Sequence, residues 1–325
     1  MKTLGHIGVL TSGGDSPGMN AAIRAVVRSA NVNGLKVTGI LGGYDGLIND
    51  RTRELGPRDV SNIIQRGGTI LRSARSEEFR TPEGRQRAKA TLDRHGIEAL
   101  VLIGGDGTFA GALKLHAEHD VSCVGLPGTI DNDVAGTDIS IGADTAANTA
   151  IEAIDRIRDT ASSHDRLFFV EVMGRNSGYL ALASAVAGGA EYVMLPEKRQ
   201  GIDALVDALR TAAQSKSSSI VVVAEGDEEG NAFEIARKVK EHFTHYDMRV
   251  AVIGHMQRGG SPTVNDRVLA SRSGVAAVEA LIAGKKNVMI GVVNGSIAYT
   301  PFQDAIQKEK VLDEELYRIL CILAT

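Results

Sequence analysis

The chain has 325 residues, of which 37 are glycine and 7 are proline, and its formal net charge is −4. The glycine content exceeds the usual ~7%, but there is no collagen period, and 43% hydrophobic with 23% charged residues is not a disordered composition. The weak negative charge excludes a global basic field for nucleic acid. No apolar run reaches the ~20 residues of a membrane helix, and the amino-terminal apolar stretch is too short for a signal sequence. We therefore expect a cytoplasmic protein in which the two cysteines, Cys123 and Cys321, are buried thiols.

Short apolar runs recur along the chain, and each is followed by a glycine turn. They are rich in β-branched residues and continuous, as is typical of strands buried on both faces of a parallel sheet. We expect strands at residues 7–10, 37–41, 99–103, 168–173, 220–224, 250–253 and 288–293. Helical apolar spacing predicts helices at residues 18–31, 143–158, 202–213, 232–243 and 264–283. This alternation predicts a doubly wound α/β fold with ligands at the carboxyl ends of the strands.

Two of the glycine turns are suited to phosphate groups. Residues 10–18 (LTSGGDSPG) join a strand to a helix, where backbone N–H groups can surround an anion; a tight turn without a ligand is the alternative. Residues 104–108 (GGDGT) follow a buried strand, and Asp106 offers an oxygen ligand for Mg²⁺. This turn also matches a loose dinucleotide fingerprint, but such patterns often arise by chance. It therefore favours a magnesium–nucleotide site.

A third turn, at residues 127–133 (PGTIDND), carries two carboxylates one residue apart. Such a pair suits a division between a general base and a group near a metal, whereas a solvated Asx turn is the alternative. The Walker A phosphate loop and the catalytic motifs of protein kinases are absent from the sequence. A phosphoryl-transfer enzyme with this sequence belongs to neither class.

Six motifs in one register give the chain a strong resemblance to the bacterial ATP-dependent 6-phosphofructokinases. They lie at residues 10–18, 66–69 (RGGT), 104–108, 127–133, 172–175 (VMGR) and 254–262 (GHMQRGGSP). The resemblance covers the whole chain and weakens after about residue 285. It implies a glycolytic phosphotransferase that transfers the γ-phosphoryl group of MgATP to the 1-hydroxyl of fructose 6-phosphate.

The resemblance also implies roles for individual residues. Asp131 corresponds to the general base, Asp106 to the Mg²⁺ ligand and Asp133 to a residue that adjusts the water shell of the metal. Residues with an implied catalytic role are Asp131, Thr129, Arg175, Gly14 and Arg75. Residues implied to bind ATP are Gly14, Arg75, Ser76, Gly105, Asp106, Gly107 and Thr108, with Tyr44 near the adenine. Residues implied to bind the sugar phosphate are Thr129, Ile130, Asp131, Arg166, Met173, Gly174, Arg175, Glu225, Arg249, His255, Met256, Gln257 and Arg258.

Family resemblance further implies an architecture of two similar doubly wound (Rossmann-like) domains, the phosphofructokinase fold. The nucleotide domain is expected at residues 1–141 and 256–305, and the fructose 6-phosphate domain at residues 142–255 and 306–325. Arg166 and Arg249 are expected to reach into the active site of a neighbouring subunit, in a homotetramer. No membrane or nucleic-acid partner is expected.

The phosphoryl donor is the main alternative left by the resemblance. A sister group uses pyrophosphate and typically carries Asp and Lys where this sequence has Gly107 and Gly128. We interpret these glycines as leaving room for the α-phosphate of a nucleotide, which favours ATP. Lipid and NAD kinases share the GGDGT turn but lack the motifs at residues 127–133 and 254–262. A dinucleotide oxidoreductase is disfavoured because the loop at residues 10–18 lacks the dinucleotide fingerprint, and an inactive sugar-phosphate sensor is disfavoured by the presence of Asp106 and Asp131.

A regulatory site for ADP or phosphoenolpyruvate is also implied. The matching residues are Arg24, Arg28, Arg158, Gly189, Glu191 and Lys216. Pro57, Gln214, Ser217 and Ser218 stand where basic or polar residues are usual. Because fewer cations bind phosphate more weakly, we expect an effector site that is altered in affinity or ligand preference.

Overall fold

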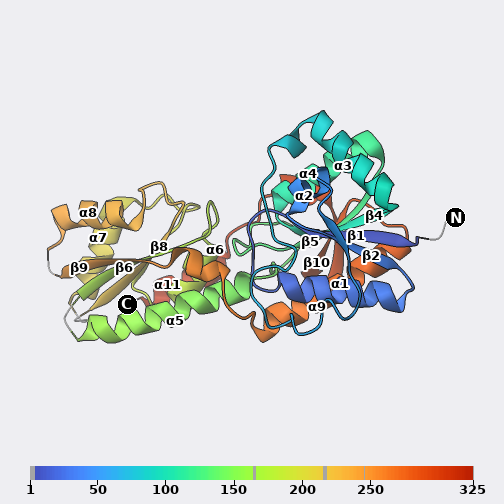
Figure 1. Ribbon diagram of the computed structural model, residues 1–325. Helices are drawn as coiled ribbons and strands as arrows, with labels where there is room; N and C mark the ends of the chain where they lie inside the picture. Colours follow the sequence, from blue (N-terminus) through green and yellow to red (C-terminus); the bar gives the residue numbers. More distant parts are fainter. Residues whose placement is uncertain (1–3, 164–165, 215–217, 245, 325) are drawn as a thin grey trace. The chain divides into compact units, whose positions relative to one another are not determined.

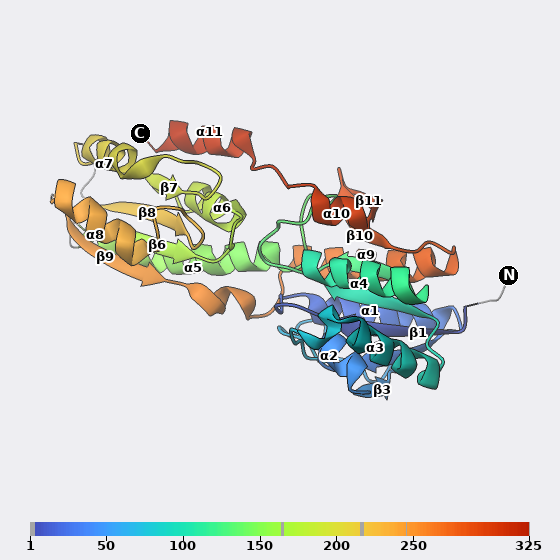
Figure 2. The same ribbon diagram turned by 90° about the horizontal axis from the view of Figure 1, so that it is seen from above.

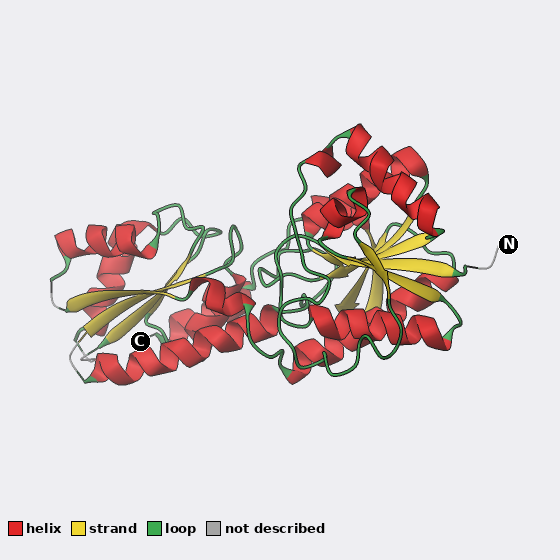
Figure 3. Cartoon of the chain, in the orientation of Figure 1, coloured by secondary structure: helices red, strands yellow, loops and turns green. Residues whose placement is uncertain are grey.

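The computed structural model describes residues 4–163, 166–214, 218–244 and 246–324. The chain forms two compact units, each with its own sheet (Figures 1 and 3). The first unit comprises Met1–Ile130, Val134–Thr145 and Arg258–Lys310, and the second comprises Asp131–Asp133, Ala146–Gln257 and Val311–Thr325. Asp131–Asp133, which the expected boundaries place in the first domain, belong to the second unit.

The first unit is built on a seven-stranded sheet with the order β11-β10-β5-β4-β1-β2-β3. The five inner strands run parallel, whereas β3 and β11 pair antiparallel at the two edges. The strands are β1 (His6–Thr11), β2 (Lys36–Ile40), β3 (Thr52–Glu54), β4 (Ala99–Gly104), β5 (Ser122–Pro127), β10 (Val288–Val293) and β11 (Ser296–Pro301). Every residue of β4 is buried, as expected for a central strand that is covered on both faces.

Helices cover both faces of this sheet (Figure 1). One face packs against α1 (Met19–Val32) and α9 (Val264–Ile282), which also pack against each other. The other face packs against α2 (Gly43–Ile48), α3 (Pro82–His95), α4 (Asp106–His119) and α10 (Phe302–Gln307), with a 3-10 turn, η1, at Glu78–Arg80. Helix α3 shows how local sequence sets the bounds: Thr81 accepts a hydrogen bond from the Gly84 N–H, and Gly96 ends the helix at φ 65°.

The second unit has a fully parallel four-stranded sheet with the order β7-β8-β6-β9. Its strands are β6 (Arg166–Val172), β7 (Tyr192–Met194), β8 (Ser219–Ala224) and β9 (Asp247–Val252). Helices α7 (Gly201–Ala212) and α8 (Ala232–His242) cover one face, as Figure 2 also shows. The remaining helices of the unit are α5 (Ala143–Ser162), which starts in the first unit, α6 (Tyr179–Ala187) and α11 (Glu314–Leu323), and η2 is a 3-10 turn at Gly254–Arg258.

The predicted α/β class is confirmed, and each predicted strand and helix overlaps an observed one. The sequence interpretation missed β5 and β7 and also the antiparallel edge strands β3 and β11. The prediction of two buried thiols is wrong for Cys321, which lies exposed on α11, whereas Cys123 is buried. Within the described residues, no helix has both the length and the apolar character to span a membrane.

Candidate active site

Three of the predicted motif loops meet at the carboxyl edge of the first sheet, because they follow the adjacent strands β1, β4 and β5. The Ser12 N–H donates to the Ile103 carbonyl at 3.0 Å, and the Gly128 N–H donates to the Gly104 carbonyl at 3.0 Å. The backbone therefore joins the loops at residues 10–18, 104–108 and 127–133 into one edge, as the doubly wound fold predicts.

The loop between β4 and α4 is packed tightly at its base. A side chain at Gly104 would place its Cβ 2.5 Å from the Ser12 carbonyl oxygen and 2.4 Å from the Thr108 hydroxyl. After Gly104, Gly105 precedes α4, and Asp106 and Gly107 are exposed in the first turn of that helix. The loop thus presents the free N–H groups of a helix N-terminus and one carboxylate to solvent, an arrangement suited to a magnesium-bound phosphate.

The two glycines used to infer the phosphoryl donor have different surroundings. A Cβ at Gly107 would meet nothing within 4 Å, so a side chain there projects into open space above the loop. A Cβ at Gly128 would lie 3.0 Å from Ile103 Cγ2 and 3.2 Å from Met19 Cε. The room-for-nucleotide interpretation is therefore supported at Gly107, but at Gly128 a side chain would point into the tightly packed interior beside Ile103 and Met19.

The first glycine loop lies against an arginine from a distant motif. Arg258 Nη1 donates to the Asp15 carbonyl at 3.2 Å, and a Cβ at Gly14 would lie 2.5 Å from the same nitrogen. The loop is also held from the other side, because the Ser73 hydroxyl donates to the Gly13 carbonyl. The structure therefore places Arg258, a predicted sugar-phosphate ligand, beside the nucleotide loop of the first unit.

Among the other predicted nucleotide-binding residues, Arg75 is exposed and Ser76 lies two residues before η1. The Ser76 hydroxyl accepts a hydrogen bond from the Phe79 N–H at 3.2 Å. Tyr44 is only 5% exposed, and its hydroxyl donates to the Thr108 carbonyl at 2.6 Å. Its ring centroid lies 3.8 Å from that of Phe79, and its expected position near an adenine ring stays a prediction.

Asp131 is buried, with 3% of its surface exposed, and belongs to the second unit. Arg175 Nε lies 3.8 Å from Asp131 Oδ2, so a half-exposed cation faces the predicted base. Next to it, Ile130 is fully buried and Asp133 is exposed. In the first unit, the Ser140 hydroxyl donates a hydrogen bond to the Thr129 carbonyl at 2.8 Å.

The predicted sugar-binding turn after β6 has an unusual backbone. Gly174 has φ 149° and Arg175 has φ 51°, a conformation that non-glycine residues adopt rarely. Glu225 Oε1 accepts from the Arg175 N–H, and Gln257 Oε1 accepts from the Met173 N–H, both at 2.9 Å. Gln257 is fully buried, so its side chain supports the turn from behind. Such contacts hold a strained turn in place.

Arg166 and Arg249 lie elsewhere on this sheet. Arg166 is the first residue of β6 and Met173 follows its last, so about 23 Å of strand separates them at ~3.3 Å per residue. On the neighbouring strand, Asp247 Oδ2 lies 3.6 Å from Arg166 Nε and 2.6 Å from Arg249 Nη2. The two arginines form a separate cationic pair, held together by an aspartate that the sequence interpretation missed.

The remaining predicted residues have varied placements. His255 and Met256 are exposed in η2, with 69% of Met256 accessible. Of the effector set, Arg158 Nη2 donates to the Gly188 and Gly189 carbonyls at 2.6 and 2.7 Å, and buried Glu191 accepts from the Ile220 N–H. Arg24 and Arg28 lie on α1 of the first unit. Lys216 and Ser217 lie outside the described residues.

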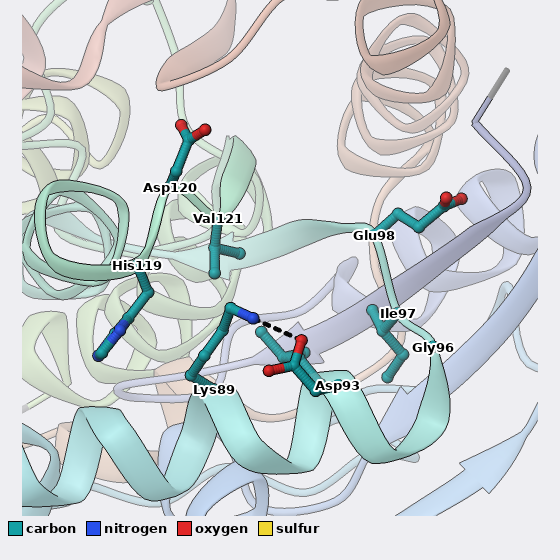
Figure 4. Close-up of a pocket in the computed structure, with 9 residues that line it drawn as sticks. Lys89, Asp93, Gly96, Ile97, Glu98, His119, Asp120 and Val121 are labelled. Atoms are coloured by element: carbon teal, nitrogen blue, oxygen red, sulfur yellow. Dashed lines mark hydrogen bonds and ion pairs between the residues drawn. The ribbon is translucent and has the colours of Figure 1, made fainter. Parts of the chain in front are cut away.

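A pocket of about 400 Å³ opens at the opposite, amino-terminal edge of the first sheet, between the ends of α3 and α4 (Figure 4). Its walls include Lys89, which pairs with Asp93, and His119, whose side chain is 15% exposed. None of the predicted site residues lines it. The pocket therefore does not belong to the loop site.

The donor chemistry at Asp106 fits a magnesium ion. In the described part of the chain, no three His, Cys, Asp or Glu side chains are grouped to hold a metal. Magnesium bound with a nucleotide needs only one or two carboxylates, because phosphate and water oxygens complete its shell. The exposed carboxylate at the start of α4 meets that requirement.

Comparison with known proteins places this fold and these loops in one family. The sequence model of the phosphofructokinase family matches residues 6–281. The ATP-dependent 6-phosphofructokinase 2 of Bacteroides thetaiotaomicron is 54% identical over 321 residues, 98% of each chain. The ATP-dependent 6-phosphofructokinase 1 of Thermus thermophilus is 56% identical over 320 residues, 98% of this chain and 99% of that protein.

A solved structure agrees with the sequence relatives. The T-state phosphofructokinase of Pichia pastoris has a TM-score of 0.87 at 37% identity, and the match covers 94% of this chain and 36% of the longer Pichia chain. The family match spans most of the chain, and the relatives align over nearly their whole length. The protein is a member of the phosphofructokinase family.

Proposed function

We propose that the protein is an ATP-dependent 6-phosphofructokinase, which transfers the γ-phosphoryl group of ATP to the 1-hydroxyl of fructose 6-phosphate. The names of the Bacteroides and Thermus relatives support this activity and this donor. The structural observation that carries the proposal is a buried carboxylate, Asp131, with a guanidinium 3.8 Å away. This pair suits the deprotonation of a sugar hydroxyl during phosphoryl transfer.

The donor occupies the carboxyl edge of the first sheet. The N–H groups at Gly14 and at residues 105–107 receive the phosphates, with Arg75, Ser76 and Thr108 beside them. Asp106 holds Mg²⁺, which when bound neutralises phosphate charge. Open space at Gly107 leaves this edge free for a nucleotide, consistent with ATP rather than pyrophosphate.

The acceptor is bound by the turn after β6. Met173, Gly174 and Arg175 contact the sugar, and Glu225 binds its ring hydroxyls while fixing the Arg175 N–H. Asp131 accepts the proton of the 1-hydroxyl, whose oxygen forms the new bond to the γ-phosphorus as the bond to ADP breaks. Thr129 and Arg175 stabilise the transferring group. The products are fructose 1,6-bisphosphate and ADP.

The 6-phosphate is bound by basic side chains from two neighbouring subunits. His255 and Arg258 come from the same chain as the turn, whereas Arg166 and Arg249 lie toward the other end of their strands. Their distance from the turn along β6 supports the proposal that they serve a neighbouring active site in a homotetramer. Bidentate guanidinium groups suit a sugar phosphate. An effector-binding role of Arg158, Gly189 and Glu191 belongs to the same proposal.

A coupled assay tests the function directly. Purified protein is incubated with Mg²⁺ and fructose 6-phosphate, with either ATP or pyrophosphate, and fructose 1,6-bisphosphate is measured. We expect product with ATP, little with pyrophosphate, and none without sugar phosphate or after chelation of the metal. Product formed faster from pyrophosphate would overturn the donor assignment. Analytical ultracentrifugation tests the tetramer, which a monomer at assay concentration would exclude.

A further inference from the structure

A short buried segment lies beside the start of the loop that carries Asp131. The Ile141 N–H donates to the Pro127 carbonyl at 2.8 Å, and Ile141 also forms an isolated parallel bridge with Gly128. Ile141 is itself fully buried. The loop therefore leaves the end of β5 paired with a second piece of backbone, which comes from further along the chain.

The residue before this bridge binds the same loop closer to the carboxylate. The Ser140 hydroxyl donates to the Thr129 carbonyl at 2.8 Å, and Ser140 is fully buried. Thr129 lies two positions before Asp131. We call residues 140–142 the support segment, because their hydrogen bonds fix the backbone that leads into Asp131.

A buried carboxylate on α9 holds the support segment in turn. Asp266 is fully buried, and it accepts from the Gly142 N–H at 2.7 Å and from the Thr145 N–H at 2.8 Å. The Thr145 hydroxyl donates to the same carboxylate. Burial raises the pKa of Asp266, while the hydrogen bonds from Thr145 and Gly142 oppose that shift. A buried carboxylate is costly without such donors, so Asp266 and this stretch of backbone fix each other.

Gly142 is also packed against the first glycine loop. Its φ is 105°, in the left-handed region, and a Cβ at this position would lie 2.5 Å from Ser16 Cβ. A glycine allows both the conformation and the close approach. The end of the support segment is thus hydrogen-bonded to Asp266 and in contact with Ser16, which leaves little room for it to shift.

We propose that Asp266 is a positioning residue for phosphoryl transfer, which sets the place of Asp131 through the Gly142 N–H and the support segment. Its hydrogen bonds act on the backbone and not on a substrate. Its loss therefore moves the base while the groups that bind the two substrates stay in place. A misplacement of about 1 Å can cost about 100-fold in rate, so the effect is on kcat. This inference rests on the proposed function.

Asp266→Asn tests the role, because it keeps the volume of the side chain but places an amide NH2 against one of the two N–H donors, at Gly142 or Thr145. We expect kcat to fall by about ten- to hundredfold, with the KM values for ATP and fructose 6-phosphate within about twofold of the wild type. Asn265→Ala is the matched control at the next position of α9. It removes a 3.3 Å hydrogen bond to Asp144 and should leave kcat unchanged.

A double-mutant cycle separates positioning from a general structural role. If Asp266 acts through the place of Asp131, its substitution has little left to change once that carboxylate is gone. We therefore expect Asp266→Asn to lower the residual kcat of Asp131→Ala by less than about twofold, since residues that act as a unit are not additive. A fall of the same size in both backgrounds would overturn the inference, and so would a wild-type kcat in Asp266→Asn.

Ser140→Ala tests the other end of the support segment, and it decides the matter if Asp266→Asn does not fold. Loss of one hydrogen bond to the Thr129 carbonyl predicts a kcat about three- to tenfold lower, with the same lack of additivity toward Asp131→Ala. An unchanged kcat, or an equal rise in both KM values with a lower melting temperature, would contradict the proposal. Failure of the proposed function differs from these results, because the wild type would then form no fructose 1,6-bisphosphate.

Discussion

The carboxyl edges of the two sheets are built on different principles. In the first unit, the loops are glycine-rich and present backbone N–H groups, and buried side chains such as Tyr44 hold them from behind. In the second unit, the turn after β6 presents side chains, and carboxylate and amide oxygens hold its backbone. A triphosphate has several similar anionic groups in a row, and successive backbone N–H groups can bind them. A sugar phosphate has different polar groups, and each needs a side chain placed to bind it. The difference predicts that changes at the two edges affect different substrates.

The largest expected effect comes from the carboxylate of the second unit. Asp131→Ala removes the group proposed to accept the proton, so kcat should fall by about 10²–10⁴-fold. Calorimetry should give nearly unchanged dissociation constants for fructose 6-phosphate and ATP. Asp138→Asn is the control, since this exposed carboxylate belongs to the first unit and should leave kcat unaltered. Near-normal turnover in Asp131→Ala would remove Asp131 from the mechanism.

Gly107 tests the backbone character of the first edge. An aspartate there projects into open space where we place the phosphates, and like-charge repulsion of several kcal/mol predicts a loss of about 100-fold or more in kcat/KM for ATP. Gly107→Ala is the matched control, because its Cβ meets nothing within 4 Å. Steady-state kinetics with ATP decide the matter. Retained ATP turnover in Gly107→Asp would contradict the placement.

Gln257 tests the supported turn of the second edge. Gln257→Leu leaves the Met173 N–H without its side-chain acceptor, which costs about 1–3 kcal/mol. We expect a KM for fructose 6-phosphate raised by about tenfold, with the KM for ATP unchanged. Gln303→Leu, at an exposed position of α10, controls for the substitution itself. An equal rise in both KM values would show that the two edges do not act separately.

The smallest effect concerns the ion pair behind the first edge. The hydrogen bond from Arg85 holds the pKa of Glu118 below its ordinary value of 4.5, with His119 and Lys114 adding a smaller favourable charge. The stabilisation is thus present above that value and lost as the pH falls through the lowered pKa. The melting temperature of Glu118→Gln should fall below that of the wild type at pH 7, and the gap should narrow on acidification. A gap that is constant with pH would exclude the ion pair as its cause.

Sequence periodicity predicted the strands that are long and rich in β-branched residues, and it failed where packing decides. Strand β5 contains Cys123 and Gly125 and ends at Pro127, so its apolar run is short and interrupted. It is a strand because it pairs with β4 and β10. Strand β7 has only three residues and is formed by pairing with β8 alone.

The motifs predicted which residues gather at the two edges, but not which way each side chain points. Gly128 belongs to the same motif as Asp131, yet a Cβ added at Gly128 would point into the protein, toward Met19. Gln257 shares a segment with exposed His255 but turns inward to the Met173 N–H. Orientation depends on tertiary contacts from distant segments. The roles of Arg85 and Asp247 follow from such contacts, and they had no local signal in the sequence.

Discontinuity of the first unit has a consequence for synthesis. Helix α1 buries its apolar stripe against α9, and strand β10 extends the sheet beyond β5. Both α9 and β10 follow residue 257 in the chain, so they leave the ribosome late. The β6–β9 sheet of the second unit is complete by Val252. A chain that leaves the ribosome from its amino end therefore finishes its second sheet first. A product terminated between these points carries a bare α1 face, which makes it prone to aggregation.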